Sequence, residues 1–483
     1  MNFGMIRYVL GWVLLCESVL LLLPGAVSLY YGESAVWALA AAALLCALLG
    51  GALIVRRPKS RVMYQREGFV ITALAWIGIS IMGALPFLFA GEIRDPVDAL
   101  FETVSGFTTT GASILADVEV LPRGLLFWRS FTHWIGGMGV LVFLLTVLPM
   151  TGGRQGGSHV NLMKAESPGP QVEKLVPKVQ STAIILYGIY IALTALQIVL
   201  LLAGGMPAFD AVTAAFGTVG TGGFGIKNDS MASYSPYLQT VVNVFMILCG
   251  VNFNFYFLLI LFKFGKAFRM EEVRWYFGII AAAILCITLD TRELYAGFGE
   301  ALRHAAFQVG SIITTTGYAT TDFNGWPMFS KTILVMLMFF GACAGSTGGG
   351  IKVSRILILH KTFRNERRMH LHPQRVNVTA MDGKVIPQGV VRATNVFIVG
   401  YVLIFFWSVL LISLDDFDFT TNFTAVAATL NNIGPGLAGV GPTQNFSQFS
   451  DLSKLVIIFD MLAGRLELFP LLLLFSRDTW KKF

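Results

Sequence analysis

The sequence predicts an all-α polytopic membrane protein with four membrane–pore-loop–membrane repeats around a central pore, plus an N-terminal helix pair. The first observation is composition: 55% of the 483 residues are hydrophobic and only 13% are charged, whereas a soluble domain carries about 25% charged residues. The second is a Thr/Gly-rich motif that recurs four times between apolar runs. Its period of roughly a hundred residues is too long for a solenoid. It suits two membrane helices with a short segment dipping between them.

The four copies of the motif align on Gly111, Gly222, Gly317 and Gly436. Glycine can turn its carbonyl groups inward at φ values that other residues avoid. Potassium filters use carbonyl rings of this kind, supplied by four Thr/Gly-rich loops. The second copy, Thr218–Gly222, is close to the TVGYG filter sequence. We assign ion binding to Thr108, Thr109, Thr110, Gly111, Thr218, Val219, Gly220, Thr221, Gly222, Thr314, Thr315, Thr316, Gly317, Asn432, Ile433, Gly434, Pro435 and Gly436.

Small residues also let membrane helices pack closely, which is the alternative explanation for any single copy of the motif. Four copies, evenly spaced and each between apolar runs, favour a filter. Repeats two and four lack the Thr-Thr-Thr run of the other two repeats. A loose cation pore is therefore the alternative to a tightly potassium-selective one.

Two apolar runs, 5–29 and 35–55, precede the repeats and predict a pair of spanning helices. A signal peptide is the alternative for the first run. Glu17 interrupts that run, and the second run ends at a basic cluster, 56–61, typical of a cytoplasmic face. We therefore expect an added hairpin over 1–62 with the N-terminus in the cytoplasm.

The repeats are expected to occupy 63–165, 166–270, 271–380 and 381–483. Short half-helices are expected to enter the membrane and stop, and irregular backbone at that depth is tolerated only where it is buried or lines a cavity. The half-helices are predicted at 96–107, 208–217 and 299–313, and the spans at 69–90, 124–149, 181–204, 237–262, 275–290, 393–414 and 452–475. With the N-terminal pair and the third returning helix this gives about ten spans, so both termini would be cytoplasmic.

The returning helix of the third repeat is predicted to break at 341–350, because each Gly costs about 1 kcal/mol relative to Ala in a helix. We interpret this segment as a gate beneath the filter; a kink that only accommodates packing is the alternative. A phosphate-binding loop is excluded, because Gly350-Ile351-Lys352 breaks the Gly-Lys-Ser/Thr rule. The gate residues are Gly345, Ser346, Thr347, Gly348, Gly349, Gly350, Lys352 and Arg465.

Two arginines and a histidine lie inside apolar runs. Arg465 is either an electrostatic barrier in a cation pore or half of an ion pair with Asp460 or with an acid on another helix, and both interpretations stay open. Arg129 and His133 are four residues apart and share a helix face. A buried charge normally has a partner, and for Arg129 we expect Glu102.

Other functional classes find little support. An enzyme needs a clustered nucleophile, base or metal set, and the six histidines are dispersed without HExxH or Ser/His/Asp spacing. The net charge of +7 comes from basic residues in loops, as the positive-inside rule expects, and does not indicate nucleic acid. The basic stretch 352–392 could contact anionic lipid heads or a soluble partner.

Five segments resemble the Trk/Ktr/HKT superfamily of potassium transporters, and most closely its TrkH-type membrane subunits: 105–112, 134–139, 344–352, 431–436 and 464–467. The resemblance covers nearly the whole chain. It implies a filter around the four aligned glycines and a gating loop in the third repeat that Arg465 faces. It also implies a homodimer in a bacterial cytoplasmic membrane, resting on a ring of cytosolic nucleotide-binding regulatory subunits of the TrkA type.

We therefore expect a chain that lets K⁺ enter the cell down its electrochemical gradient, with K⁺ as the only ligand and no organic cofactor. A Na⁺- or H⁺-coupled potassium symporter is the alternative. Coupling of that kind usually uses intramembrane carboxylates. Glu17, Asp460 and Glu467 are few and lie away from the filter motifs, so the symporter ranks second.

Overall fold

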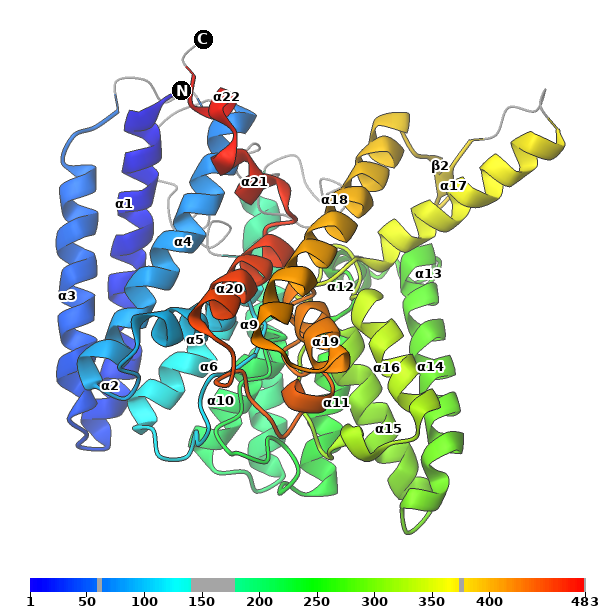
Figure 1. The fold of residues 1–483 in the computed structure, drawn as a ribbon, viewed down its shortest axis with the longest axis horizontal. Coiled ribbons are helices and arrows are strands. Elements are labelled where there is room, and N and C mark those ends of the chain that lie inside the picture. Colours follow the sequence, from blue (N-terminus) through cyan, green and yellow to red (C-terminus); the bar gives the residue numbers. More distant parts are fainter. Residues whose placement is uncertain (59–62, 140–178, 373–377, 482–483) are drawn as a thin grey trace.

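The computed structural model describes residues 1–58, 63–139, 179–372 and 378–481 (Figure 1). The described chain is almost entirely helical, with one small antiparallel hairpin of β1 (Ala380–Met381) and β2 (Lys384–Val385). The predicted all-α membrane class is confirmed by this helical content and by several long apolar helices.

The N-terminal helices α1 (Phe3–Leu20), α2 (Leu22–Tyr30) and α3 (Ala35–Ile54) stand at one side of the molecule, against α4 (Figure 1). Glycines set the close approach of α1 and α3. A Cβ atom at Gly11 would lie 2.8 Å from the carbonyl oxygen of Gly50. This is the small-residue contact by which membrane helices pack, and it holds α1 and α3 together.

After these N-terminal helices, the same order of elements recurs four times: a long helix, a short helix, a loop and a returning helix. The long helices are α4 (Gln65–Ala90), α9 (Val179–Ala203), α14 (Glu271–Thr291) and α18 (Gln388–Ile412). The short helices are α5 (Pro96–Phe107), α10 (Ala208–Val219), α15 (Phe298–Ile313) and α19 (Phe419–Leu430). Four repeats were predicted from the sequence, but without bounds for the fourth short helix.

The returning helices begin as α6 (Arg123–Gly137), α11 (Pro236–Cys249), α16 (Met328–Phe339) and α20 (Asp451–Arg465). Three of them resume after a break, as α12 (Phe253–Ile260), α17 (Val353–Leu371) and α21 (Phe469–Phe475). The remaining short elements are α13 (Phe264–Ala267), α22 (Arg477–Trp480) and 3₁₀ turns at 292–294, 323–325, 413–415 and 438–440.

A break in the third returning helix was predicted, and α16 and α17 are indeed separate helices. The continuous spans predicted at 237–262 and 452–475 are wrong. The axis turns by 92° between α11 and α12, and Glu467 and Leu468 take positive φ between α20 and α21. For the span predicted at 124–149, the structure describes α6, which ends at Gly137. The part of this span beyond residue 139 lies outside the described residues.

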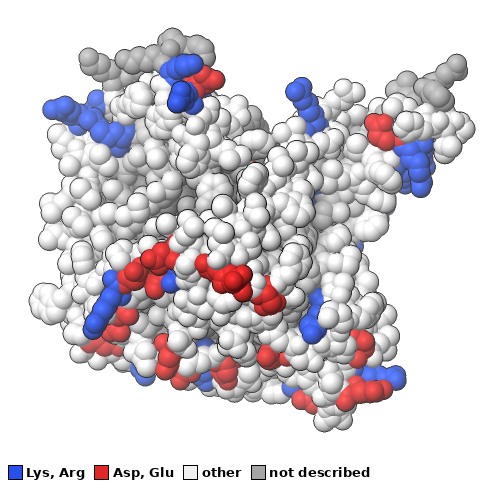
Figure 2. Space-filling model, in the orientation of Figure 1, with Lys and Arg blue, Asp and Glu red and all other residues white. Residues whose placement is uncertain are grey.

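These breaks explain why fewer unbroken spanning helices are found among the described residues than the ten or so spans predicted from the sequence. Among the described residues, six helices are long and apolar enough to cross a membrane, or seven if α11 and α12 form one bent span. Of the other returning helices, α6, α16, α20 and α21 are too short to count individually, and α17 carries too many basic residues. Charge is also asymmetric: Figure 2 shows clusters of basic side chains at the upper end, where both termini lie, and a band of acidic side chains across the lower half, with some basic ones among them.

Candidate functional site

The four loops that follow the short helices share one backbone conformation. Each short helix ends at a capping residue, and the next residue has a φ of 55° to 59°. Two positions further on, a glycine has a φ of 78° to 96°. The residues of the first position are Thr109, Thr221, Thr315 and Asn432, and those of the second are Gly111, Gly223, Gly317 and Gly434. The loops are therefore four copies of one structure.

The residue between these two positions makes the same hydrogen bond in every loop, from its N–H to the carbonyl five residues earlier. Thr110 donates to Ser105 at 2.9 Å and Gly222 donates to Gly217 at 2.8 Å. Thr316 donates to Ser311 and Ile433 to Ala428, both at 2.8 Å. This shared bond fixes the register of the four loops independently of their side chains.

The four loops close into a ring. A Cβ atom at Gly111 would collide with the carbonyl oxygen of Gly222, and one at Gly317 with that of Ile433. In the same order around the ring, Gly223 faces the Thr316 carbonyl and Gly434 faces the Thr110 carbonyl. Glycine is required at these positions for two reasons: its φ is positive, and a side chain would collide with the neighbouring carbonyl oxygen. The ring gathers the carbonyl oxygens of Thr110, Gly222, Thr316 and Ile433.

The ring corrects the alignment made from the sequence. The equivalent glycines of repeats two and four are Gly223 and Gly434, not Gly222 and Gly436. The likeness of 218–222 to TVGYG is out of register, because Thr218 and Val219 still belong to α10. Gly436 lies past the ring, where its N–H donates to the Val440 carbonyl at 2.7 Å. Gly223 was not assigned to the filter from the sequence. The two adjacent glycines, Gly222 and Gly223, were the feature that could have indicated a second possible register.

The side chains that support the loops differ from repeat to repeat. In repeats one and three a threonine pair braces the loop, with 2.8 Å between the Oγ1 atoms of Thr108 and Thr110 and the same distance between Thr314 and Thr316. Repeat two has no such pair, because Gly222 stands at the ring position. There the imidazole of His133 fills the space beside Gly222.

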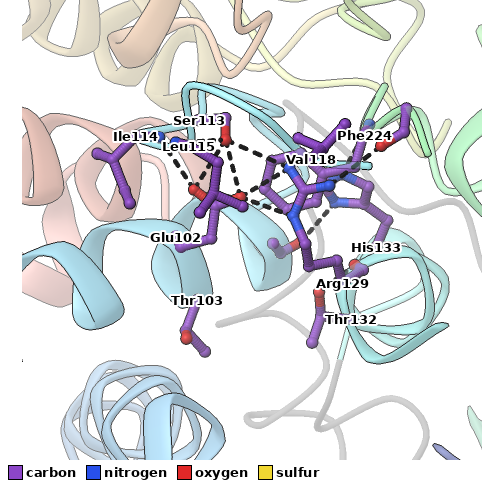
Figure 3. A network of polar contacts seen from close by, with 12 residues as sticks. Glu102, Thr103, Ser113, Ile114, Leu115, Val118, Arg129, Thr132, His133 and Phe224 are labelled. Atoms are coloured by element: carbon purple, nitrogen blue, oxygen red, sulfur yellow. Dashed lines mark hydrogen bonds and ion pairs between the residues drawn. The ribbon is translucent and has the colours of Figure 1, made fainter. Parts of the chain in front are cut away.

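Two hydrogen bonds hold His133 in place (Figure 3). The N–H of Phe224 donates to Nε2 at 3.2 Å, so Nδ1 carries the proton and donates to the Gly106 carbonyl at 2.7 Å. The neutral imidazole thus joins the short helix of repeat one to the loop of repeat two.

The partner expected for Arg129 is confirmed: its Nε lies 2.7 Å from Oε1 of Glu102 (Figure 3). Both side chains are buried. Arg129 also donates to the Gly225 carbonyl at 3.1 Å, and Glu102 accepts from Ser113 Oγ and the Ile114 N–H at 3.0 Å. The pair therefore ties α5, α6 and the second loop together behind the ring.

The segment between α16 and α17 packs against the ring. The N–H of Gly349 donates to Thr315 Oγ1 at 2.6 Å. Lys352 is buried and its ammonium donates to the carbonyls of Gly348 and Gly349. A buried carboxylate, Glu272, anchors the segment, accepting from the N–H of Ala344 at 2.7 Å and of Ser354 at 3.1 Å. Sequence reasoning missed Glu272, because it lies at the start of an outer helix.

Arg465 connects the segment between α16 and α17 to the end of α6. Its Nη1 donates to the Thr347 carbonyl at 2.9 Å, and its Nη2 donates to the carbonyls of Gly136 and Gly137 at the end of α6. Helix C-termini attract cations through these unpaired carbonyls. The ion pair with Asp460 considered above is wrong, since Asp460 accepts from Ser408 Oγ at 2.6 Å. Arg465 thus faces the segment 340–352, as the gate assignment requires.

Four half-length helices that end at one ring of backbone carbonyls, inside a chain of apolar membrane-length helices, define a membrane transport protein. Among the residues that the structure describes, no group of three His, Cys, Asp or Glu side chains could hold a metal ion. The model of the TrkH family, described as "cation transport protein", matches residues 37–290 and 279–482. The chain belongs to this family.

Named relatives agree with this assignment. The Trk system potassium uptake protein TrkH of Salmonella typhimurium is 36% identical over 490 residues, and the match covers all of both chains. The TrkG protein of the Escherichia coli Trk system is 33% identical over 99% of this chain and 98% of its own. The crystal structure of the potassium transporter TrkH from Vibrio parahaemolyticus superposes with a TM-score of 0.88 at 34% identity, over the full length of both chains.

Proposed function

We propose that this chain takes up K⁺ across the bacterial cytoplasmic membrane through a K⁺-selective, channel-like pore. The observation that carries the proposal is the ring of four carbonyl oxygens, from Thr110, Gly222, Thr316 and Ile433. Such oxygens can replace the water shell of a dehydrated K⁺. The names of the relatives, which are potassium uptake proteins, support the same substrate.

The short helices add to the attraction for a cation. All four end at the ring, so their C-terminal dipole ends point toward the proposed ion path. A helix C-terminus carries a partial negative charge of about half an elementary charge. The chain's own residues thus supply a negative environment without carboxylates at the ring itself.

The segment 341–350, together with Lys352 and Arg465, is the proposed gate. It contacts the ring through Thr315 and holds two cationic side chains close to the carbonyl-lined path. In this position the cations oppose the passage of K⁺. Opening would require Arg465 to release Thr347, driven by a cytosolic nucleotide-binding subunit of the TrkA type.

The proposal includes a homodimer with both termini in the cytoplasm, in contact with membrane lipid. The gathering of basic side chains at the end that holds the termini supports this orientation (Figure 2). It also includes the division into units 1–62, 63–165, 166–270, 271–380 and 381–483, with the gating segment at 341–350.

Uptake of a radioactive rubidium tracer into proteoliposomes tests the function. We expect K⁺ to block uptake far better than Na⁺; equal block by the two ions would contradict a K⁺-selective filter. Repeating the assay with an imposed Na⁺ or pH gradient separates a channel-like pore from a coupled symporter. If no tracer enters, adding a cytosolic extract with nucleotide shows whether a regulatory subunit is needed.

A further inference from the structure

The loop of the fourth repeat lacks the threonine pair that braces the loops of repeats one and three. Its ring carbonyl belongs to Ile433, which has no hydroxyl group to pair with a neighbour. One position earlier, Asn432 stands where the other three loops carry a threonine. The Asn432 side chain is fully buried, so its amide must find partners inside the protein.

The amide of Asn432 reaches the neighbouring loop. Nδ2 donates to Thr110 Oγ1 at 2.9 Å and to the Met461 carbonyl on α20 at 2.9 Å. The carbonyl can only accept, which identifies the atom facing it as the amide nitrogen. The side chain therefore links loop four, loop one and the last returning helix.

The hydroxyl groups beside Asn432 form a chain with a defined direction. Thr108 donates its one hydroxyl hydrogen to the Val104 carbonyl at 2.7 Å. The hydrogen in the 2.8 Å contact between Thr108 and Thr110 must then come from Thr110. Thr110 Oγ1 is left as an acceptor, which the Asn432 amide satisfies. The chain of hydrogen bonds runs from α20 through two filter loops to the pore helix α5.

This series of hydrogen bonds passes from loop four to loop one at a single contact, between Asn432 and Thr110. Thr110 and Ile433 carry adjacent ring carbonyls, and Gly434 packs directly against the Thr110 carbonyl. A filter that distinguishes ions by size or by carbonyl field must keep its oxygens from closing in on the smaller Na⁺. The hydrogen bond between Asn432 and Thr110 opposes an inward movement of the ring carbonyls at loop four, which has no threonine pair of its own.

We propose that Asn432 is a positioning residue that sets K⁺-over-Na⁺ discrimination by holding the Thr110 and Ile433 carbonyls apart. This inference rests on the proposed potassium uptake. It assigns Asn432 a positioning role, because its amide nitrogen is held by Thr110 and Met461. Its Oδ1 points away from any protein donor, beside Gly349 and Gly464.

The test measures the concentrations of K⁺ and Na⁺ that halve rubidium uptake into proteoliposomes. Asn432→Leu keeps a similar volume and removes the hydrogen bonds. We expect the ratio of the two concentrations to fall by roughly three- to tenfold, the factor that one net hydrogen bond supplies. Thr110→Val removes the same bond from the other side and is expected to give a similar loss. Thr110→Ser keeps the hydroxyl and is expected to restore the ratio.

The matched control is Tyr401→Phe. It removes a 2.7 Å hydrogen bond to Asn431, the neighbouring buried asparagine, which does not join two loops. We expect an unchanged ion ratio in this variant. A double variant, Asn432→Leu with Thr110→Val, should lose less than the sum of the two single losses, because both single variants already remove the shared bond between Asn432 and Thr110.

The outcomes separate this inference from the function on which it rests. If the unaltered protein shows no preference for K⁺, the proposed function fails. If it prefers K⁺ and both Asn432→Leu and Thr110→Val keep that preference, the positioning role is overturned while the function stands. Equal losses in Tyr401→Phe would also overturn it, since they would indicate general loosening of the fold. Thermal unfolding in detergent checks that each variant is folded.

Discussion

Arg465 and Thr347 are joined by a 2.9 Å hydrogen bond between Nη1 and a backbone carbonyl, across 118 positions of sequence. The same guanidinium holds the end of α6 through Gly136 and Gly137. One side chain from the fourth repeat thus connects the end of α6 to the break in the third returning helix. In the proposed mechanism this latch keeps the pore closed.

Replacing Arg465 should therefore raise basal transport. Arg465→Gln removes the charge and most of the donors, and we expect rubidium uptake without any cytosolic partner to rise by roughly five- to tenfold, the lower range of a typical coupling between sites. Arg477→Gln, at an exposed position, is the control and should leave uptake unchanged. Uptake that stays at the original level in Arg465→Gln would rule out the latch.

Glu272 should act on the same segment from the opposite side. Its carboxylate accepts from the N–H of Ala344, inside the gating segment, and from the N–H of Ser354, at the start of α17. Glu272→Gln weakens both bonds, because bonds to an ionised group are the stronger kind, so basal rubidium uptake should rise. The adjacent Glu271→Gln, which disturbs only a partly exposed pair with Lys361, is the comparison. Equal uptake in the two variants would mean that the anchor has no part in gating.

The ring itself is tested by adding a single methyl group. Gly317 has a φ of 87° and faces the Ile433 carbonyl, so Gly317→Ala is expected to abolish K⁺-selective rubidium uptake. Its positive φ alone costs an L-residue about 1–2 kcal/mol. Gly325→Ala, in the same repeat, meets nothing within 4 Å and serves as the control. Preserved discrimination between K⁺ and Na⁺ in Gly317→Ala would remove Thr316 and Ile433 from the filter.

The Arg129–Glu102 pair is expected to support stability. Arg129→Met leaves the Glu102 carboxylate buried without its cation, and breaking such a pair costs about 3–5 kcal/mol. We expect a markedly lower unfolding temperature in detergent. The surface pair of Arg292 and Glu293, with side chains 62% and 84% exposed, offers the contrast: Arg292→Met should change the midpoint little. Similar midpoints for both variants would contradict the structural role.

A double variant refines this result. Because the carboxylate is the buried charge that loses its partner, Arg129→Met combined with Glu102→Leu should recover part of the lost stability. An additive loss in the double variant would mean that the two side chains act independently, against the 2.7 Å contact between them.

Much of this architecture could be predicted from local sequence. Apolar runs of membrane length identified the outer helices, and the half-helix predicted at 96–107 is the observed α5. The glycine content of 341–350 was enough to expect a break there. Arg129 and Glu102 were paired correctly, because a buried charge in a membrane helix needs a partner and few acids were at hand.

The alignment of the second and fourth loops with the first and third could not be predicted from local sequence. Several glycines lie side by side in 217–223 and 434–436, so more than one alignment satisfies the pattern. Where each short helix ends decides among them, and helix boundaries are the least certain part of any sequence-based assignment. Only the ring contacts single out Gly223 and Gly434.

The sequence by itself determined that this is a membrane protein with a repeated Thr/Gly loop, because hydrophobicity, helix length and glycine content are local properties. The tertiary structure decided how the loops are braced: by threonine pairs, by His133 and by Asn432. It also decided what Arg465 and Glu272 hold. Asn432 and Thr110 are 322 positions apart, and no local pattern encodes a hydrogen bond over that separation. Such contacts exist only once the four repeats have packed around one axis.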